Sequence, residues 1–365
     1  MEKRLNILYI SFTDLIKCSS GSEVRPIKML KYFRETGNNI VVVKGRYKPF
    51  IYSERKKNIK QVIHDMKSIK FDLCYVEPTS GCISSIWDYF LLKSIVKNKI
   101  PIGYFYRDSF AKIGKGIVVN KKNFKGLLIE IYSRIFTPIN DFLINKYCDI
   151  VYFPTIEMSK YFNFKNKKEL LPGGEIIEYK CSHNRIPRVI YVGASSDNYG
   201  VKNLLETFSL INCNQVSLKL LIVTREEEFY SKYSSYANKK WLELSHVTGT
   251  NKLKKMYERA DIAIAPFLRN AYSDIACSVK IFEYLSFGLP IVATNTPIMV
   301  RLIKDNNIGF ICEDNCLSMK KIIENALFDV DELKNKRKAV KIFLKKKGLW
   351  SKRVSTVIND LSNIK

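Results

Sequence analysis

Lys280 and Glu283 stand three residues apart, and their types and spacing are the first in this sequence that point to chemistry. They lie in SVKIFEYLSFGLPIVAT, residues 278–294, which reads as a short helix, a Gly/Pro turn and a buried strand. Ser278 can cap that helix, so the pair would lie near a helix N-terminus, where backbone amides favour anions. The same spacing is also that of an ordinary solvated surface pair.

Further candidates follow predicted strands, because ligands of open parallel sheets bind outside the carboxyl ends of the strands. Glycines in the loops Cys18–Glu23 and Gly193–Asn198 would let backbone amides approach a phosphate, and nearby cations would pair with it. The negative charge of Glu283 would repel a phosphate, but its carboxylate can accept hydrogen bonds from the two hydroxyls of a ribose. Neither loop has GxGxxG or GxxxxGK[ST] spacing, which disfavours a dinucleotide fold or a P-loop. The strand-end candidates are Gly21, Ser22, Glu23, Arg25, Glu77, Arg107 and Asp108 in the first half, and Gly193, Lys202, Arg225 and Asp274 in the second.

The elements that must position these residues form the same pattern twice. In each half, apolar runs of strand length alternate with helices, which predicts an α/β fold of two doubly wound, Rossmann-like domains facing a cleft. Turn residues cluster from Leu170 to Pro187, and we place the domain boundary there. The predicted strands are Leu5–Ser11, Ile40–Val43, Leu73–Val76, Ile102–Tyr106, Ile150–Phe153, Arg188–Val192, Leu218–Val223, His246–Gly249, Ile262–Pro266, Ile291–Ala293 and Ile308–Cys312. The predicted helices include Val24–Glu35, with Pro26 in its first turn, Trp87–Val96, Val201–Leu210 and Lys252–Arg259.

The net charge of +26, from 61 Lys and Arg against 35 Asp and Glu, favours an anionic partner. Nucleic acid, an anionic membrane surface and an anionic substrate all fit, and so does a Lys-rich composition with no function. Residues 44–70 and 111–125 are strongly basic. Within 111–146, apolar residues at helical spacing beside a basic flank indicate either a membrane-surface helix or an ordinary helix packed on the sheet.

Several classes of protein are disfavoured by what the sequence lacks. Nine Cys without a CxxC pair predict reduced thiols rather than a disulfide framework, and three scattered His disfavour a zinc site. The first residues, MEKRLNILYISF, do not read as a signal peptide, and there is no run of about 18 apolar residues. We therefore expect a cytoplasmic protein with no bound metal and no membrane-spanning helix.

Three blocks in the second half resemble the family 4 glycosyltransferases of the GT-B fold. They read VIYVGASSDNYGVKNLLETF, HVTGTNKLKKMYERADIAIAPF and SVKIFEYLSFGLPIVAT, in that order within residues 188–312. The first half, with LNILYIS, GNNIVVV, IPIGYFYRD and CDIVYFPT, is compatible with the same family. The resemblance implies a nucleotide-sugar donor held mainly by the C-terminal domain, transfer with retention, and no required metal or cofactor. It also implies a C-terminal helix that crosses back, which gives domains of residues 1–172 and 173–340 and a returning helix at 341–365.

The resemblance also assigns roles to the candidate residues. Glu283 matches the carboxylate that binds the donor ribose, and Gly193 matches the glycine of the phosphate-side loop. Gly21 and Ser22 match the glycine-rich loop that approaches the diphosphate. Asp108 lies near where the family often keeps a His or a carboxylate facing the transferred sugar, which makes it the catalytic candidate. The donor-binding candidates are completed by Lys280, Lys202, Arg225 and Asp274, and the acceptor-binding candidates are Glu23, Arg25 and Arg107.

Three positions depart from the family pattern. The first of two paired carboxylates falls on Ile275, so Asp274 serves instead or the acid is missing. The family's phosphate-binding lysine is Tyr199 here. No arginine lies in the Gly193 loop, so the charge must come from Lys202, Lys280 or Arg225. Two candidates keep a structural alternative, since Asp108 could cap a helix and Arg225 could pair with its acidic neighbours.

The favoured hypothesis is a hexosyl- or related glycosyltransferase acting in bacterial surface-polysaccharide synthesis. It would move a sugar from a nucleotide diphosphate sugar to a glycan or lipid-linked acceptor, docked on an anionic membrane surface at the inner face of the cell membrane. One alternative is a non-catalytic partner subunit of the same fold, and another is a sugar-nucleotide epimerase. A basic nucleic-acid-binding protein is the third, although no helix-turn-helix or RNA-binding motif is present.

Overall fold

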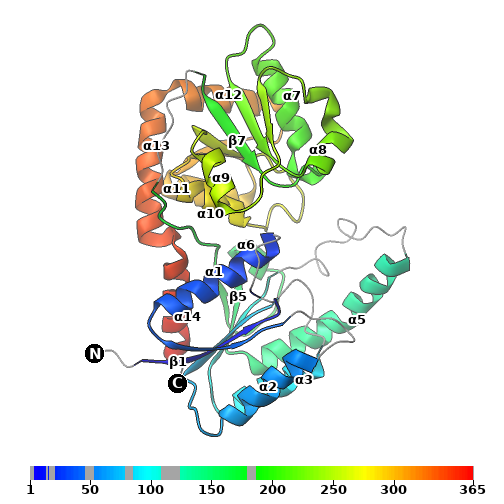
Figure 1. Cartoon of the computed structure of the whole chain (residues 1–365), viewed down its shortest axis with the longest axis vertical. Helices are drawn as coiled ribbons and strands as arrows, with labels where there is room; N and C mark the ends of the chain where they lie inside the picture. The colour runs from blue at the N-terminus through cyan, green and yellow to red at the C-terminus, as the bar shows by residue number, and fades with distance from the viewer. Residues whose placement is uncertain are drawn as a thin grey trace. The chain divides into compact units, whose positions relative to one another are not determined.

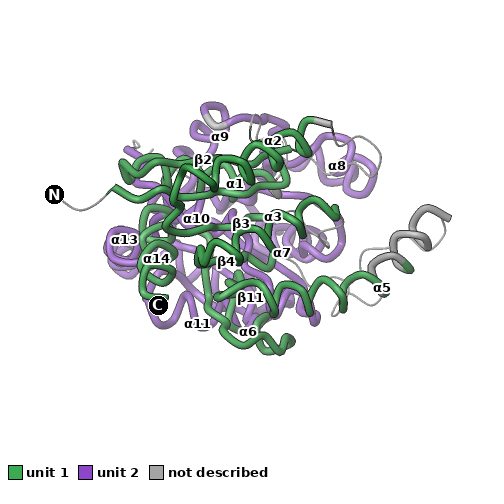
Figure 2. The backbone as a smooth tube through the Cα atoms, turned by 90° about the horizontal axis from the view of Figure 1, so that it is seen from below, with its two compact units in different colours: residues 1–172, 350–365 green, residues 173–349 purple. Residues whose placement is uncertain are grey.

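The computed structural model describes residues 4–13, 15, 21–45, 53–78, 85–107, 124–178 and 186–364. The chain divides into two compact units, each built around one six-stranded sheet (Figure 2). Unit 1 comprises residues 1–172 and 350–365, and unit 2 comprises residues 173–349. The predicted α/β class with two doubly wound parallel sheets is confirmed.

Unit 1 holds a sheet with the strand order β2-β1-β3-β4-β5-β6, in which every pair is parallel. Its strands are β1 (Asn6–Ser11), β2 (Asn39–Val43), β3 (Leu73–Glu77), β4 (Ile102–Phe105), β5 (Ile150–Phe153) and β6 (Lys167–Glu169). The central strands β1, β3, β4 and β5 are buried apolar runs, as parallel strands covered by helices on both faces must be. The strand order reverses between β1 and β3, which is where ligands of such sheets bind.

Helices cover both faces of this sheet (Figure 1). The last helix, α14, packs against α1 and along β3 and β4, while α3 contacts α2 and α5. The helices of unit 1 are α1 (Gly21–Glu35), α2 (Ser53–Asp65), α3 (Ile86–Lys97), α5 (Phe124–Tyr147), α6 (Ile156–Ser159) and α14 (Trp350–Ser362). The end of the chain thus belongs to the first unit, although all of unit 2 precedes it in the sequence.

A buried ion pair holds the carboxyl end of β1 against two of these helices. The guanidinium of Arg55 in α2 donates to both carboxylate oxygens of Asp88 in α3, at 2.6 to 3.2 Å. It also donates to the carbonyl of Ser11 at 2.7 Å and lies 4.1 Å over the ring of Phe12. Both charged side chains are 3% exposed, and each has its partners, so the pair is satisfied inside the unit.

Unit 2 holds a second all-parallel sheet, with the strand order β12-β11-β10-β7-β8-β9. Its strands are β7 (Arg188–Val192), β8 (Lys219–Val223), β9 (Leu242–Ser245), β10 (Ile262–Ala265), β11 (Ile291–Thr294) and β12 (Gly309–Cys312). Its helices are α7 (Val201–Ile211), α8 (Glu226–Tyr233), α9 (Thr250–Tyr257), α10 (Val279–Ser286), α11 (Pro297–Asn306), α12 (Cys316–Phe328) and α13 (Val330–Phe343). The strand order reverses between β7 and β10, so the loops after these two strands flank the expected ligand site.

The start of α1 differs from the sequence prediction. The helix begins at Gly21, so Gly21, Ser22 and Glu23 form its first turn rather than a loop. Pro26 consequently lies in the second turn, and its carbonyl accepts from the hydroxyl of Tyr9 at 2.8 Å. Gly and Pro near a helix start are ambiguous signals, and packing against β1 settles where this helix begins.

Two strands also differ from the sequence prediction. The predicted strand His246–Gly249 is wrong, because β9 is Leu242–Ser245 and ends just before it. The basic run Lys167–Glu169 forms the edge strand β6, which pairs only with β5. Edge strands need no apolar pattern, so periodicity in the sequence does not reveal them.

No helix in the described part of the chain combines the length and the apolar character that crossing a bilayer requires. Among the same residues, no three His, Cys, Asp or Glu side chains gather as a metal site would need. The cysteines that the structure describes are free, and burial raises the pKa of the Cys74 thiol.

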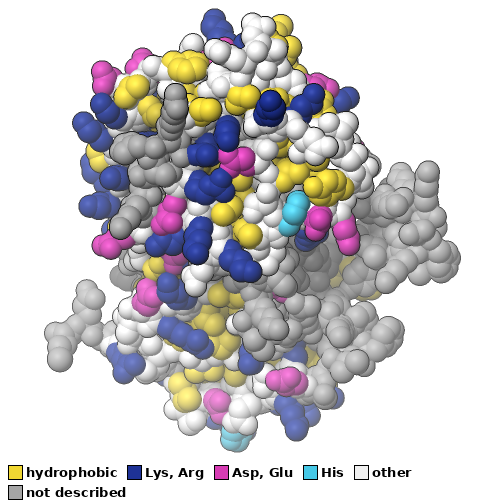
Figure 3. Space-filling model, turned by 45° about the horizontal axis from the view of Figure 1, so that its top comes forward, with side chains coloured by type: hydrophobic (Ala, Val, Ile, Leu, Met, Phe, Trp, Pro, Cys, Tyr) yellow, Lys and Arg dark blue, Asp and Glu magenta, His cyan; other side chains and the backbone are white. Residues whose placement is uncertain are grey.

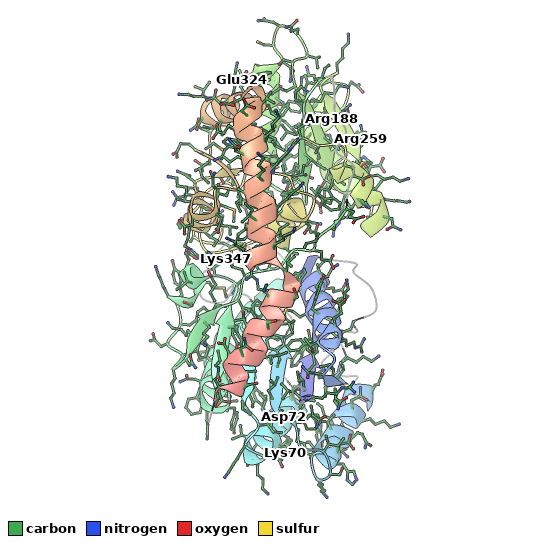
Figure 4. All side chains as sticks on the ribbon, turned by 90° about the vertical axis from the view of Figure 1, so that its left-hand side faces the viewer. Lys70, Asp72, Arg188, Arg259, Glu324 and Lys347 are labelled. Atoms are coloured by element: carbon green, nitrogen blue, oxygen red, sulfur yellow. The ribbon has the colours of Figure 1, made fainter. Side chains whose placement is uncertain are left out.

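An ion cluster lies at the amino end of the unit 2 sheet, opposite the carboxyl ends of the strands. Arg188 at the start of β7 and Arg259 after α9 lie side by side and both donate to Glu243 of β9 (Figure 4). Lys219 at the start of β8 lies 3.3 Å from the same carboxylate. Partial burial alone would raise the pKa of Glu243, but the hydrogen bond and charge of Arg188, the charge of Arg259 and the hydrogen bond of Lys219 outweigh it. The pKa of Glu243 is therefore lowered.

Glu243→Gln is expected to lower the free energy of unfolding by about 1–3 kcal/mol near neutral pH, the usual contribution of hydrogen bonds to a charged group. The folded-state pKa of Glu243 lies below its unfolded value, so its contribution is complete above about pH 5 and is lost as the pH falls through the folded pKa. Urea unfolding of both proteins at several pH values measures this, and the two stabilities should converge in acid.

The matched control is Glu332→Gln, because Glu332 is 45% exposed and pairs with Lys336 in the same unit. This variant should change the free energy of unfolding by less than about 0.5 kcal/mol. A Glu243 difference that persists unchanged in acid would contradict the assignment.

Candidate functional site

Residues 278–294 fold locally as predicted. Helix α10 begins after Ser278, whose hydroxyl accepts from the backbone amide of Lys280 at 3.3 Å. Gly288 follows the helix with a φ of 64°, in the left-handed region that favours glycine, and β11 comes next. Glu283 and Lys280 remain partly accessible to solvent. The side chains of α10 that pack into the unit are Ile281, Phe282, Tyr284 and Leu285.

Lys280 and Glu283 form the predicted pair, and a third residue joins them. The Nζ of Lys280 donates to Oε2 of Glu283 at 2.7 Å, and their side chains are 30% and 27% exposed. The hydroxyl of Tyr257, at the end of α9, donates to the same oxygen at 3.0 Å. An ordinary solvated surface pair explains the contact between Lys280 and Glu283. It does not explain the contact from Tyr257, in which a buried phenol donates to the carboxylate. Lys280 keeps two further N–H donors for an anion, since an ammonium group has three.

Tyr284 fixes this helix to the end of β7. Its buried hydroxyl accepts from the backbone amide of Val192 at 2.9 Å and lies 3.4 Å from the carbonyl of the same residue. Gly193 follows directly, and its amide donates to the carbonyl of Val223 at 3.0 Å. A Cβ added at Gly193 would lie 3.0 Å from the Tyr191 hydroxyl, so the backbone here has little room for a side chain. The glycine of the predicted phosphate-side loop is thus tied to the helix that carries Glu283.

Gly200 brings the loops after β7 and β10 together, at the point where the strand order reverses. It has a φ of 70°, and a Cβ added there would lie 1.7 Å from the carbonyl oxygen of Pro266. Next to it, the ring of Tyr199 lies 5.9 Å from that of Phe267 and is 39% exposed. Lys202, in the first turn of α7, is 70% exposed and forms only a 3.8 Å pair with Glu206, so its ammonium can reach a ligand.

Arg225 pairs with an acidic neighbour, as its structural alternative predicts. Its Nη1 donates to Oε1 of Glu228 at 3.0 Å, while its side chain is 75% exposed. The other oxygen of Glu228 accepts from the amide of Ser195, two residues after Gly193, at 3.2 Å. Glu228 therefore connects Arg225 to the Gly193 loop, and an exposed pair of this kind is weak enough for an anion to displace.

Asp274 is engaged by an arginine. The guanidinium of Arg269, in the loop after β10, donates to both carboxylate oxygens of Asp274 at 2.9 and 3.0 Å. Ile275, at the position of the missing acid, is 4% exposed and faces the core. A ligand that donates hydrogen bonds to Asp274 must therefore displace Arg269. A diphosphate would instead bind Arg269 and displace Asp274.

In unit 1, Arg25 is enclosed rather than available. Its side chain is 3% exposed, its Nε donates to Oε1 of Glu77 at 3.1 Å, and its guanidinium lies 3.6 Å over the ring of Phe105. Its Nη1 also donates to the carbonyl of Leu171 at 3.3 Å. The predicted contact of Arg25 with an acceptor is not supported by this burial. The buried acid Glu77 at the end of β3, which also accepts from Tyr75, balances the charge.

The other first-half candidates divide into described and undescribed residues. Gly21 and Ser22 lie in the first turn of α1, and Glu23 in the same turn is 8% exposed. Arg107 follows β4, and its Nη1 has no hydrogen-bond partner among the residues that the structure describes. The catalytic candidate Asp108 lies outside the described residues, so its role stays a prediction.

The structure thus brings together one group and leaves the other candidates dispersed. Glu283 and Lys280 touch each other, and Tyr284 links their helix to the strand that ends at Gly193. Lys202, Arg225 and Asp274 lie on loops or helix starts at the same edge of the sheet, each in its own ion pair. Tyr257 and Arg269 are not among the site residues that the sequence predicts. Tyr257 lies inside the block HVTGTNKLKKMYERADIAIAPF and within the predicted helix Lys252–Arg259, but nothing in the sequence marks it as a partner of Glu283, and Arg269 follows a predicted strand.

Comparison with known proteins supports the resemblance. Residues 186–329 match the family described as "Glycosyl transferases group 1". No curated protein sequence matches the chain significantly. Among solved structures, sucrose-phosphate synthase from Thermosynechococcus elongatus has a TM-score of 0.66 at 11% identity, with 98% of each chain covered. Anabaena HepE in complex with UDP and glucose has a TM-score of 0.64 at 12% identity, covering 99% of this chain and 100% of its own.

A third similar structure is WaaG, "a glycosyltransferase involved in lipopolysaccharide biosynthesis", with a TM-score of 0.61 at 12% identity, covering 98% of this chain and 100% of its own. At these identities the structural likeness establishes the fold alone. The chain therefore has the GT-B fold of glycosyltransferases. The segment that matches the Glycosyl transferases group 1 family lies within the second unit and includes Gly193 and Glu283.

Gly200→Ala is expected to lower the free energy of unfolding by about 3–5 kcal/mol, because left-handed strain adds to a steric overlap with the Pro266 backbone. Gly249→Ala is the matched control, since Gly249 has a φ of 89° but a Cβ there meets nothing within 4 Å. It should cost only about 1–2 kcal/mol. Urea unfolding measures both, and equal losses would show that the loops after β7 and β10 are not in close contact.

Proposed function

We propose that this protein is a glycosyltransferase that transfers a hexosyl or related sugar, with retention, from a nucleotide diphosphate sugar to a glycan or lipid-linked acceptor. The acceptor would belong to a cell-surface polysaccharide. Unit 2 would bind the donor, and unit 1 would bind the acceptor. No cofactor and no metal is required in this proposal, because the chain's own cations would stabilise the leaving diphosphate.

The observation that carries the proposal is the environment of Glu283. Its carboxylate lies in the family-matched segment, in the first two turns of α10, and accepts hydrogen bonds from Lys280 and Tyr257. A carboxylate held by two donors has a fixed orientation, which suits it to accept hydrogen bonds from the hydroxyls of a donor ribose. The proteins of similar fold support this choice of ligand, since HepE has been solved with UDP and glucose.

The leaving group is a nucleoside diphosphate, whose negative charge grows as the bond to the sugar breaks. Stabilisation of that charge where it develops is the largest effect available to the protein. Lys280 has two free N–H donors beside the α10 N-terminus, and Lys202 is exposed at the start of α7. Arg225 and Arg269 would exchange a surface carboxylate for the diphosphate. Gly193 would let the backbone of its loop approach the phosphates.

The transferred sugar and the acceptor would be held by unit 1. Asp108 would position or polarise the reacting groups, as the family resemblance implies. Arg107 and Glu23 would contact the acceptor, while the buried Arg25 would support the carboxyl ends of β3 and β4 rather than touch it. WaaG, which acts in lipopolysaccharide biosynthesis, supports an acceptor of the surface-polysaccharide type.

Helix α5 supports a peripheral position on the inner face of the cell membrane. One stripe along its described residues is apolar and exposed. The stripe consists of Ile131, Ile135, Ile139 and Phe142, which are 46%, 55%, 50% and 65% exposed. The opposite side carries the buried polar residues Thr137 and Asn140. The same side also buries Ile144, so α5 packs on the unit with one side and leaves an apolar stripe exposed on the other, which supports binding to a membrane surface.

Two of the alternatives, the non-catalytic subunit and the nucleic-acid-binding protein, are each favoured by one observation. The buried Ile275 at the position of an expected acid favours a non-catalytic subunit that keeps the fold. The net charge of +26 favours nucleic acid, but on the face that Figure 3 shows, the Lys and Arg of the described residues lie among Asp and Glu. A subunit without donor binding and a nucleic-acid-binding protein would both fail the next experiment.

Glu283→Gln is expected to weaken binding of the preferred donor about 10-fold to 100-fold, since a charged acceptor for the ribose hydroxyls becomes neutral. A thermal-shift panel of UDP-, GDP-, ADP- and CMP-sugars with the wild type first identifies that donor, because a ligand of the folded state raises the midpoint of unfolding. The matched control is Glu324→Gln, an ordinary α12 pair with Lys320 distant in sequence from the site motifs. Undiminished turnover by Glu283→Gln would overturn the site, and a panel without any shift would overturn the proposed function.

Ile135→Glu with Ile139→Glu is expected to lower partitioning onto vesicles containing anionic phospholipid by about 10-fold or more, because two apolar side chains can no longer enter the interface. Cosedimentation of the full chain measures this. Ile342→Glu is the matched control, as Ile342 is 54% exposed on α13. Wild-type protein that stays in the supernatant would contradict the membrane proposal and leave the donor site untouched.

A further inference from the structure

The two oxygens of the Glu283 carboxylate have different surroundings. Oε2 accepts two hydrogen bonds, from Lys280 at 2.7 Å and from Tyr257 at 3.0 Å. No residue in the described part of the chain donates to Oε1. A carboxylate oxygen offers about two lone-pair positions, so Oε2 is filled and the capacity that remains lies on Oε1. This division leaves one defined oxygen for a ligand that donates hydrogen bonds.

The side chain of Tyr257 is itself held in place on the core side. It is 3% exposed, and its ring stacks on that of Phe287 with centroids 4.5 Å apart at an interplanar angle of 24°. The ring of Tyr284 meets it edge-on at 5.9 Å. Both partners come from α10 or the residue that follows it, so Tyr257 joins the end of α9 to the helix that carries Glu283. Its phenol oxygen has little freedom to move away from the carboxylate.

Packing alone does not explain why the side chain at position 257 carries a hydroxyl group. A phenylalanine would fill the same space, and the hydroxyl of the neighbouring Tyr284 goes to backbone atoms of Val192. The hydroxyl of Tyr257 goes instead to the carboxylate of the candidate site. Burial, and then the negative charge of Glu283, raise the pKa of Tyr257 well above its usual value, so the phenol remains a hydrogen-bond donor.

We infer that Tyr257 is a positioning residue for the donor ribose. By holding Oε2 together with Lys280, it presents Oε1 of Glu283 to the ribose hydroxyls and thereby gives the site a preference for ribonucleotides over 2′-deoxyribonucleotides. The inference rests on the proposed function, because it takes Glu283 as the residue that binds the ribose. A flexible glutamate would have to be ordered by each ligand, whereas this one is oriented before the ligand arrives.

The test compares matched ribo and 2′-deoxy ligands, namely UDP with dUDP, GDP with dGDP and ADP with dADP. Calorimetry on the full chain gives the ratio of the two dissociation constants for the preferred base. Tyr257→Phe, which removes one oxygen atom, should lower that ratio about threefold to tenfold, the factor that corresponds to one hydrogen bond. A structural role would weaken both ligands equally and leave the ratio unchanged.

Tyr233→Phe is the matched control. Tyr233 is 5% exposed in the same unit, packs on Phe229, and its hydroxyl has no hydrogen-bond partner among the described residues. This variant makes the same chemical change without touching Glu283, and it should keep the wild-type ratio. Circular dichroism and the midpoint of thermal unfolding confirm that both variants are folded.

A double-mutant cycle with Glu283→Gln gives a second, independent readout. If Tyr257 acts through Glu283, the double variant should show the same ribo/deoxy ratio as Glu283→Gln alone. Equal weakening of both ligands by Tyr257→Phe, or additive effects in the cycle, would overturn the inference while the proposed function stands. A wild type that binds none of the nucleotides would overturn the proposed function, and the inference with it.

Discussion

The hydrogen bonds between the Tyr284 hydroxyl and the backbone of Val192 are the contact on which the candidate site depends. Glu283 precedes Tyr284 in the chain, and Gly193 follows Val192. One buried phenol therefore sets the position of the Glu283 carboxylate relative to the loop that begins at Gly193. Because this contact joins a helix to the end of a strand, the site inherits the rigidity of the sheet rather than the mobility of a loop.

The parallel arrangement of each sheet explains why the candidates gather at one edge. In unit 2 the strand order reverses between β7 and β10, and Gly200 allows the loops after these strands to touch. In unit 1 the corresponding edge is braced by buried ion pairs, Arg55 with Asp88 and Arg25 with Glu77. Both pairs are enclosed in the protein, so removal of one partner would leave an uncompensated buried charge. Charged residues thus form enclosed ion pairs in unit 1 and exposed ion pairs at the corresponding edge of unit 2.

The cations at the edge of the unit 2 sheet are paired with carboxylates. Lys202 pairs with Glu206, Arg225 with Glu228 and Arg269 with Asp274, and in each pair at least one side chain is 40% or more exposed. Exposed pairs contribute little to stability, so a diphosphate can replace the carboxylate at small cost. The Glu283 group differs, because its third member, Tyr257, is buried. The exposed pairs contain the cations that would neutralise the charge of a diphosphate. The Glu283 group, with its buried tyrosine, contains the carboxylate that would orient the ribose.

The sequence by itself determined the fold class, ten of the eleven predicted strands, and the local form of α10, because apolar periodicity, a Ser cap and a Gly/Pro turn act within a few residues of each other. It also placed Lys280 beside Glu283, since three residues on a helix are neighbours. Only the tertiary structure decided that Tyr257 completes this pair, that Arg25 is enclosed by Glu77 and Phe105, and that the apolar stripe of α5 faces outward. These contacts join residues far apart in the chain, and their formation depends on how helices pack on the sheet. No local spacing in the sequence carries that information.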